Sequence, residues 1–177
     1  MREKVTAERV EKFMKAIGRA GKKNVRIYFV GGATAVLLGW RETTIDLDVK
    51  IIPDVDEILR ALPRLKEDLK LNIELASPDD FIPPLPGWEE RSAYIAKEGS
   101  TEFFHYDFYA QALAKIERGH NTDILDVRNM IEHGLIEPSR LMELFTRIEG
   151  SLYKYPAIDA ESFRAAVEEF LKKHSQQ

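Results

Sequence analysis

Two acidic side chains, Asp46 and Asp48, interrupt an apolar stretch that predicts a β-strand over residues 45–52. Successive side chains of a strand point to opposite faces, so both carboxylates project from one face while Leu47 and Val49 project from the other. The Cα atoms of Asp46 and Asp48 are then roughly 6.5 Å apart. Two carboxylates this close repel one another unless a cation or a basic group lies between them.

A glycine pair, Gly31 and Gly32, stands upstream of the acidic strand, after a short apolar strand predicted over residues 25–30. Glycine lets a backbone approach a ligand closely. The pair opens a short predicted helix, residues 33–38, where N–H groups favour an anion such as phosphate. Mg²⁺ and Mn²⁺ suit the carboxylate pair, because they bind a couple of carboxylates together with water and phosphate oxygens. This combination indicates phosphoryl or nucleotidyl transfer.

Each feature has a simpler interpretation when it is taken alone. A Gly-Gly pair is often only a turn. An Asp-x-Asp strand can be an exposed sheet edge on which Asp46 and Asp48 pair with Arg41 and Lys50. The order and separation of the two features favour a metal–nucleotide site over these alternatives.

The remaining chain predicts a single α+β domain over residues 1–177. A mixed α/β core covers about residues 22–110, and a helical C-terminal part covers about residues 111–175. Further strands are predicted over residues 72–76, 93–97 and 102–109, and the last of these includes His105 and Asp107. Buried in such a strand, His105 is expected to be structural, with a proton shuttle as the alternative.

Composition excludes several classes of protein. The net charge of −4 argues against a general nucleic-acid coat. The absence of cysteine excludes disulfides, thiol catalysis and cysteine-based zinc sites. No apolar stretch has the length of a membrane span, and the charged N-terminus does not resemble a signal peptide. We therefore expect a cytoplasmic protein with no membrane partner.

Two stretches carry a resemblance to a known family. The first, residues 30–49, reads VGGATAVLLGWRETTIDLDV. It resembles the signature of nucleotidyltransferases with a polymerase-beta-like core, in which a glycine turn at a helix start precedes Asp-x-Asp. It is most similar to small AbiEii-toxin-related and DUF6036-type nucleotidyltransferases, where Arg-x-Thr-Thr precedes that motif. The second, residues 105–136, resembles a later motif of this group, and the likeness extends over most of residues 25–150.

The resemblance implies a nucleotidyltransferase-like mixed sheet flanked by helices, with a defined set of site residues. A third carboxylate, Asp107, would join Asp46 and Asp48 in holding Mg²⁺ or Mn²⁺ or would act as a base for the attacking hydroxyl, and Lys115 would complete the catalytic set. The residues implied in binding the nucleoside triphosphate substrate are Gly31, Gly32, Arg41, Thr43, Thr44, Asp123 and Asp126. Two alternatives stay open: Asp107 caps the following helix, and Lys115, Arg118, Asp123 and Asp126 form an ion-pair network.

The function predicted from these residues is metal-dependent transfer of a nucleoside monophosphate group from a nucleoside triphosphate to an acceptor hydroxyl. An RNA 3′ end, tRNA in particular, a protein hydroxyl and a small antibiotic are all open as acceptors, and the resemblance favours tRNA or a protein. It also implies a toxin–antitoxin system, in which a cognate antitoxin or toxin would be the partner. The alternative from another class is a catalytically inactive binding module that keeps the fold and serves as an antitoxin or regulatory subunit.

Overall fold

The computed structural model describes residues 1–174, which form two compact units. The first unit comprises Met1–Ser77 and Ser92–Tyr106 and contains all the strands of the described residues. The second unit comprises, among the described residues, Pro78–Arg91 and residues 107–174, and it is helical.

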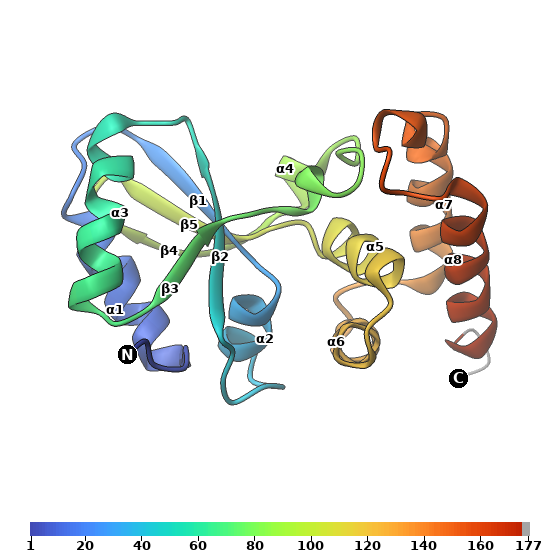
Figure 1. The fold of residues 1–177 in the computed structure, drawn as a ribbon, viewed down its shortest axis with the longest axis horizontal. Coiled ribbons are helices and arrows are strands. Elements are labelled where there is room, and N and C mark those ends of the chain that lie inside the picture. The colour runs from blue at the N-terminus through green and yellow to red at the C-terminus, as the bar shows by residue number, and fades with distance from the viewer. Residues whose placement is uncertain (175–177) are drawn as a thin grey trace. The chain divides into compact units, whose positions relative to one another are not determined.

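The first unit is a five-stranded mixed sheet with three helices (Figure 1). The strand order is β3-β2-β1-β5-β4. β1 pairs antiparallel with β2 and parallel with β5, β3 is parallel to β2, and β4 is antiparallel to β5. In chain order the elements are α1 (Ala7–Gly18), β1 (Val25–Val30), α2 (Gly32–Leu38), β2 (Asp46–Ile52), α3 (Asp56–Asp68), β3 (Asn72–Leu75), β4 (Ala93–Glu98) and β5 (Thr101–His105).

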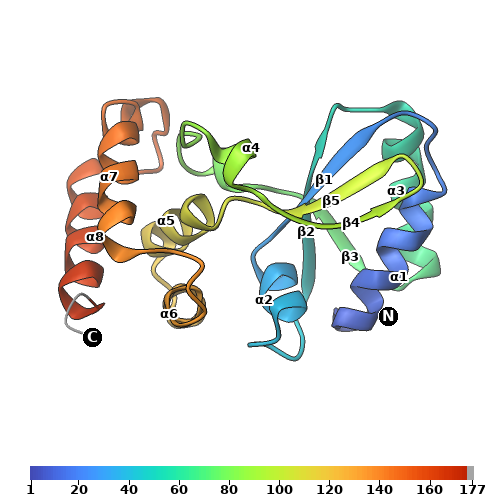
Figure 2. The same cartoon turned by 180° about the vertical axis from the view of Figure 1, so that it is seen from behind.

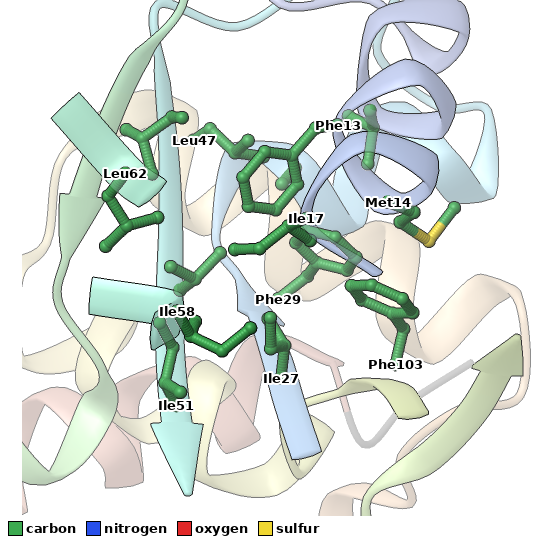
Figure 3. Packing of buried hydrophobic residues seen from close by; sticks show 14 of the residues in the cluster. Phe13, Met14, Ile17, Ile27, Phe29, Leu47, Ile51, Ile58, Leu62 and Phe103 are labelled. Carbon is green, nitrogen blue, oxygen red and sulfur yellow. The ribbon is translucent and has the colours of Figure 1, made fainter. Parts of the chain in front are cut away.

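The alternation of β2 determines which face of the sheet is buried. Leu47, Val49 and Ile51 are buried, whereas Asp46 and Asp48 are half-buried on the other face. The buried face packs against α1 and α3 (Figures 1 and 2), and Figure 3 shows Phe13 and Ile17 of α1 directed toward the sheet. Each fully buried side chain of this size contributes roughly 1.5–3 kcal/mol. The core therefore holds β2 with its acidic residues turned outward.

The second unit is built from helices that pack through their apolar faces. Phe145 and Phe163, for example, meet edge to face with ring centroids 4.9 Å apart. In chain order the elements are η1 (Pro78–Asp80), α4 (Trp88–Arg91), α5 (Phe108–Arg118), α6 (Asn121–Glu132), α7 (Pro138–Glu149), η2 (Leu152–Lys154) and α8 (Ala160–His174). Between residues 1 and 174, no helix has the length and apolar character needed to cross a membrane.

The predicted fold class, a mixed sheet flanked by helices with a helical C-terminal part, is confirmed. The prediction that one strand runs through Asp107 to residue 109 is wrong. β5 ends at His105, and Asp107 is the N-cap of α5, where its side chain accepts a hydrogen bond from the Tyr109 backbone N–H at 3.1 Å. An aspartate in this position satisfies an N–H group that the helix leaves without an acceptor, so α5 begins at Phe108, ahead of the helical part predicted from about residue 111.

His105 is a structural residue of the first unit, as predicted. Its side chain is 6% exposed, and its Nδ1 lies 3.1 Å from the Thr34 hydroxyl. That hydroxyl donates to the Phe29 carbonyl at 3.3 Å, so it accepts from His105, which places the proton of the neutral imidazole on Nδ1. Burial lowers the pKa of His105 from its ordinary 6.5 to about 4.

We expect His105 to make the protein sensitive to acid. Its pKa is lower in the folded chain, so between pH 6.5 and 4 the unfolded chain binds more protons. The stability linked to neutral His105 is therefore complete above the unfolded pKa and is lost as the pH falls toward about 4. The loss should be about 3 kcal/mol. Urea unfolding at pH 6.5 and at pH 4 should show a clearly smaller loss of unfolding free energy for His105→Gln than for the wild type. Equal losses would contradict this origin.

Candidate active site

The glycine turn lies directly against one of the two strand carboxylates. Gly31 has φ +62° and ψ −124°, a conformation that residues with a Cβ rarely adopt. A Cβ added to Gly31 would lie 3.7 Å from Asp48 Oδ2, within van der Waals contact. The absence of a side chain therefore leaves room beside the carboxylate, where the backbone can meet a substrate.

Gly32 is required for a different reason. A Cβ at this position would lie 2.0 Å from Thr44 Oγ1 and 2.6 Å from Thr44 Cβ, which is a collision. Thr44 is itself fixed by backbone hydrogen bonds with Val5 in both directions, of 2.8 and 3.0 Å. Thr44, predicted as a nucleotide-binding residue, thus holds the loop before β2 against the start of α2. Arg41 and Thr43 lie in the same loop and are half-buried.

The polar face of β2 continues onto β3. In the parallel register Asp46 lies opposite Asn72, and Asp48 lies opposite Glu74. Asn72 Nδ2 donates to Asp46 Oδ1 at 2.5 Å and to Glu74 Oε1 at 2.9 Å. An amide therefore lies between two acids that would otherwise repel one another.

Asn72 and Glu74 were not predicted as site residues, although the sequence carries a signal for them. The stretch LNIEL, residues 71–75, alternates in the same way as the acidic strand, with polar residues at 72 and 74. The alternation alone does not show that residues 72 and 74 belong to the site. That follows only from the β2–β3 register, which brings Glu74 opposite Asp48. The same register excludes the alternative of an exposed edge, because β2 lies between β3 and β1.

Asp107 belongs to the second unit, where it has a cationic partner. Arg91 donates to Asp107 Oδ2 through Nε at 3.2 Å and through NH2 at 2.7 Å. Burial raises the pKa of Asp107, and the charge and hydrogen bonds of Arg91 oppose that rise. These contacts agree with the capping alternative. Because Asp46 and Asp48 lie in the other unit, a shared metal site of the three carboxylates stays a prediction.

Lys115, Asp123 and Asp126 meet in a buried ion network between α5 and α6. Lys115 Nζ lies 2.8 Å from Asp126 Oδ2 and 3.5 Å from Asp123 Oδ1, and the three side chains are at most 8% exposed. Arg118 completes the set by binding both oxygens of Asp123, at 2.5 and 2.7 Å. Burial raises the pKa of Asp123, but the Arg118 hydrogen bonds and the Lys115 charge together hold it below its ordinary value. Two cations thus balance two acids.

Metal ligation can be judged from the donors on the polar face. Asp46 and Asp48 offer carboxylate oxygens, which are the ligands that Mg²⁺ and Mn²⁺ prefer. Across residues 1–174, no three His, Cys, Asp or Glu side chains are grouped closely enough to hold a metal ion. The face therefore fits a cation held by two carboxylates, with water and phosphate oxygens as the other ligands.

Comparison with known protein families identifies the class of protein to which the chain belongs. A family model described as a nucleotidyltransferase of unknown function, DUF6036, matches residues 7–175. The chain therefore belongs to this family of nucleotidyltransferases, as the resemblance implied. No curated protein and no solved structure matched the chain.

The ion network predicts a large stability effect. Asp126→Ala should lower the free energy of unfolding by about 3 kcal/mol, because Lys115 stays buried without its nearest partner. Lys115→Met with Asp126→Leu should recover most of that loss, since the buried charges are then removed together. Urea denaturation measures both variants.

The matched control for the network is Glu169→Ala, which removes an exposed pair with Lys173 and should leave the urea denaturation midpoint essentially unchanged. If Asp126→Ala is as stable as the wild type, the network has no structural role. The double variant Lys115→Met with Asp126→Leu is expected to fold. Its rate of nucleotidyl transfer therefore tests, apart from stability, whether Lys115 and Asp126 are needed for the reaction.

Proposed function

We propose that the chain is a metal-dependent nucleotidyltransferase that transfers a nucleoside monophosphate from a nucleoside triphosphate to an acceptor hydroxyl. The observation that carries the proposal is the position of the Gly31 turn, where an added Cβ would lie 3.7 Å from Asp48 Oδ2, on the strand face that also presents Asp46. Family membership supports nucleotidyl transfer in general. The metal, the acceptor and a toxin–antitoxin role belong to the proposal.

The polar face supports a cation by its charge. Among the described residues, Asp46 and Glu74 accept hydrogen bonds from the neutral Asn72 amide and form no ion pair. Mg²⁺ or Mn²⁺ held by Asp46 and Asp48 would supply the positive charge that a triphosphate requires. Asn72 would orient Asp46 by holding the oxygen that it already contacts.

The glycine pair and a further carboxylate each have a defined part in the proposed reaction. Gly31 and Gly32 allow the triphosphate to approach the backbone at the start of α2, beside Asp48. The acceptor oxygen attacks the α-phosphorus in line, the bond to the β-phosphate oxygen breaks, and pyrophosphate leaves with the electron pair. The hydroxyl proton passes to a carboxylate. We propose Glu74 for this step, because it lies opposite Asp48 in register, with Asp107 as the sequence-based alternative.

Label transfer tests the enzyme class. With each α-³²P nucleoside triphosphate and Mg²⁺ or Mn²⁺, the wild type should label an acceptor in total RNA or total protein from a lysate. Asp46→Asn and Asp48→Asn should each reduce labelling about a hundredfold or more, because a bound metal contributes several kcal/mol to the transition state. Asp68→Asn on α3, an exposed aspartate, is the control and should label normally.

Undiminished labelling by both Asp46→Asn and Asp48→Asn would refute the proposed site. If no nucleotide or metal gives label and no nucleotide shifts the melting temperature, the inactive binding module becomes the better hypothesis. The size and class of the labelled molecule identify the acceptor, whether tRNA, another RNA or a protein.

A second comparison separates the two candidate bases. Glu74→Gln removes the proposed base and should lower the rate of transfer about a hundredfold. Because Glu74 is exposed, the same substitution should leave the melting temperature unchanged. Asp107→Asn should lower the free energy of unfolding by about 1–3 kcal/mol, because Arg91 loses a charged acceptor. Both rates are measured well below the melting temperatures. Full activity of Glu74→Gln, together with an inactive but equally stable Asp107→Asn, would favour the sequence-based assignment.

A further inference from the structure

A pocket of about 430 Å³ lies at the edge of the first unit, next to the residue that holds Asp46. Its lining residues are Arg2, Glu3, Lys4, Ile45 and Asn72. This volume lies within the range of sites that bind small molecules. The N-terminal segment forms one wall of the pocket, and Figure 1 shows this end of the chain beside the start of β3.

Backbone hydrogen bonds hold this N-terminal wall in place. The Glu3 N–H donates to the Lys70 carbonyl at 2.8 Å, and Val5 pairs with Thr44 in the loop before β2. The Glu3 carboxylate also pairs with Arg9 and, at 3.6 Å, with Lys70. The N-terminal segment is therefore an ordered part of the first unit, fixed by backbone hydrogen bonds and ion pairs.

A chain of hydrogen bonds links this wall to the carboxylate pair. The Arg2 guanidinium donates to Asn72 Oδ1, and Asn72 Nδ2 donates to Asp46 Oδ1 at 2.5 Å. Asn72 thus uses both its acceptor and its donor to connect the pocket with Asp46. A ligand in the pocket would lie next to the proposed metal ligand.

The chemistry of the lining favours an anion. Glu3 is neutralised by Arg9 and Lys70, so Arg2 and Lys4 determine the charge of the pocket. Within residues 1–174 Lys4 forms no ion pair, and the only acidic partner of Arg2 is the exposed Glu67 at 4.0 Å. Ile45, 73% exposed, adds an apolar contact beside these cations. A phosphate group attached to an organic body matches this combination.

The position of the pocket indicates which substrate it serves. Gly31 lies against Asp48, which is paired with Val30 at the end of β1. Asp46 lies two residues before Asp48, at the start of β2, and the pocket follows beyond Asn72 on the neighbouring strand. In-line transfer places the attacking hydroxyl opposite the departing pyrophosphate. If the triphosphate lies at Gly31, the acceptor enters from the Asp46 side.

We infer that this pocket is an acceptor subsite that binds a phosphate group of the acceptor through Arg2 and Lys4. The assignment to the acceptor rests on the proposed nucleotidyl transfer, whereas phosphate binding by the pocket does not. The phosphate can be a phosphodiester, as at the end of a nucleic acid, or a monoester, as in a sugar phosphate. A cationic acceptor, such as an aminoglycoside, does not fit the charge of the pocket.

Calorimetric titration of the full chain tests the subsite. The probes are a dinucleotide with a free 3′-hydroxyl, which carries a phosphodiester, and glucose 1-phosphate, which carries a monoester. The uncharged comparisons are the nucleoside and glucose. At least one phosphate probe should bind the wild type more tightly than its uncharged counterpart, and the affinity should fall with added salt. The probe that binds identifies the source of the phosphate.

The variant Arg2→Gln with Lys4→Gln should weaken binding of that probe about tenfold and reduce its salt dependence. Glutamine at position 2 can still donate to Asn72, so the fold and Asp46 are left in place. The control, Lys22→Gln with Lys23→Gln, removes the same charge from exposed residues before β1 and should leave binding unchanged. Binding of the Mn²⁺–nucleoside triphosphate complex should be unaffected in both variants.

Equal affinity of the Arg2/Lys4 variant and the wild type, or no binding of either phosphate probe, would overturn the subsite. Loss of Mn²⁺–nucleotide binding in the Arg2/Lys4 variant would place these cations on the triphosphate instead, and would also overturn it. Because probe binding requires no catalysis, these results are independent of label transfer by the Asp46 and Asp48 variants. Failure of the subsite can therefore be told apart from failure of the proposed function.

Discussion

The packing of β2 against α1 and α3 determines where the acidic residues of this chain can lie. Leu47, Val49 and Ile51 enter the core, so the intervening Asp46 and Asp48 must face the other way. A slip of one residue in register would bury two carboxylates and expose three apolar side chains, and both changes are costly. The hydrophobic core therefore fixes the chemistry of the opposite face, although no core residue takes part in it.

The neighbouring strands then decide which side chains join that face. Pairing with β1 brings the Gly31 turn against Asp48, and pairing with β3 places Asn72 and Glu74 beside Asp46 and Asp48. The Asn72 amide donates to both Asp46 and Glu74, so the acids are held apart before any cation is present. A neutral donor can do this without removing the negative charge that a metal ion would need.

The local features of the site could be predicted from the sequence, because they depend on residues close together in the chain. Alternation predicted the outward side chains of β2, and the glycine pair predicted the turn before α2. Contacts between distant segments could not be predicted. The Asn72–Asp46 hydrogen bond requires the β2–β3 register, and no periodic signal in residues 78–91 pointed to Arg91 as the partner of Asp107. At Asp107 two local signals competed: alternation continued the strand, but the side chain capped α5.

The acids on the polar face of the first unit and the buried acids of the second unit differ in how their charge is balanced. In the second unit Asp107 pairs with Arg91, Asp126 with Lys115, and Asp123 with both Arg118 and Lys115. A buried carboxylate without such a partner would cost several kcal/mol, so these pairs are conditions of folding for α5 and α6. On the half-buried face of the first unit, solvent can stabilise Asp46 and Glu74, and a neutral amide is sufficient to hold them. Partial exposure is thus what allows the sheet to keep negative charge available for a cation, whereas the helical unit must neutralise its buried acids internally.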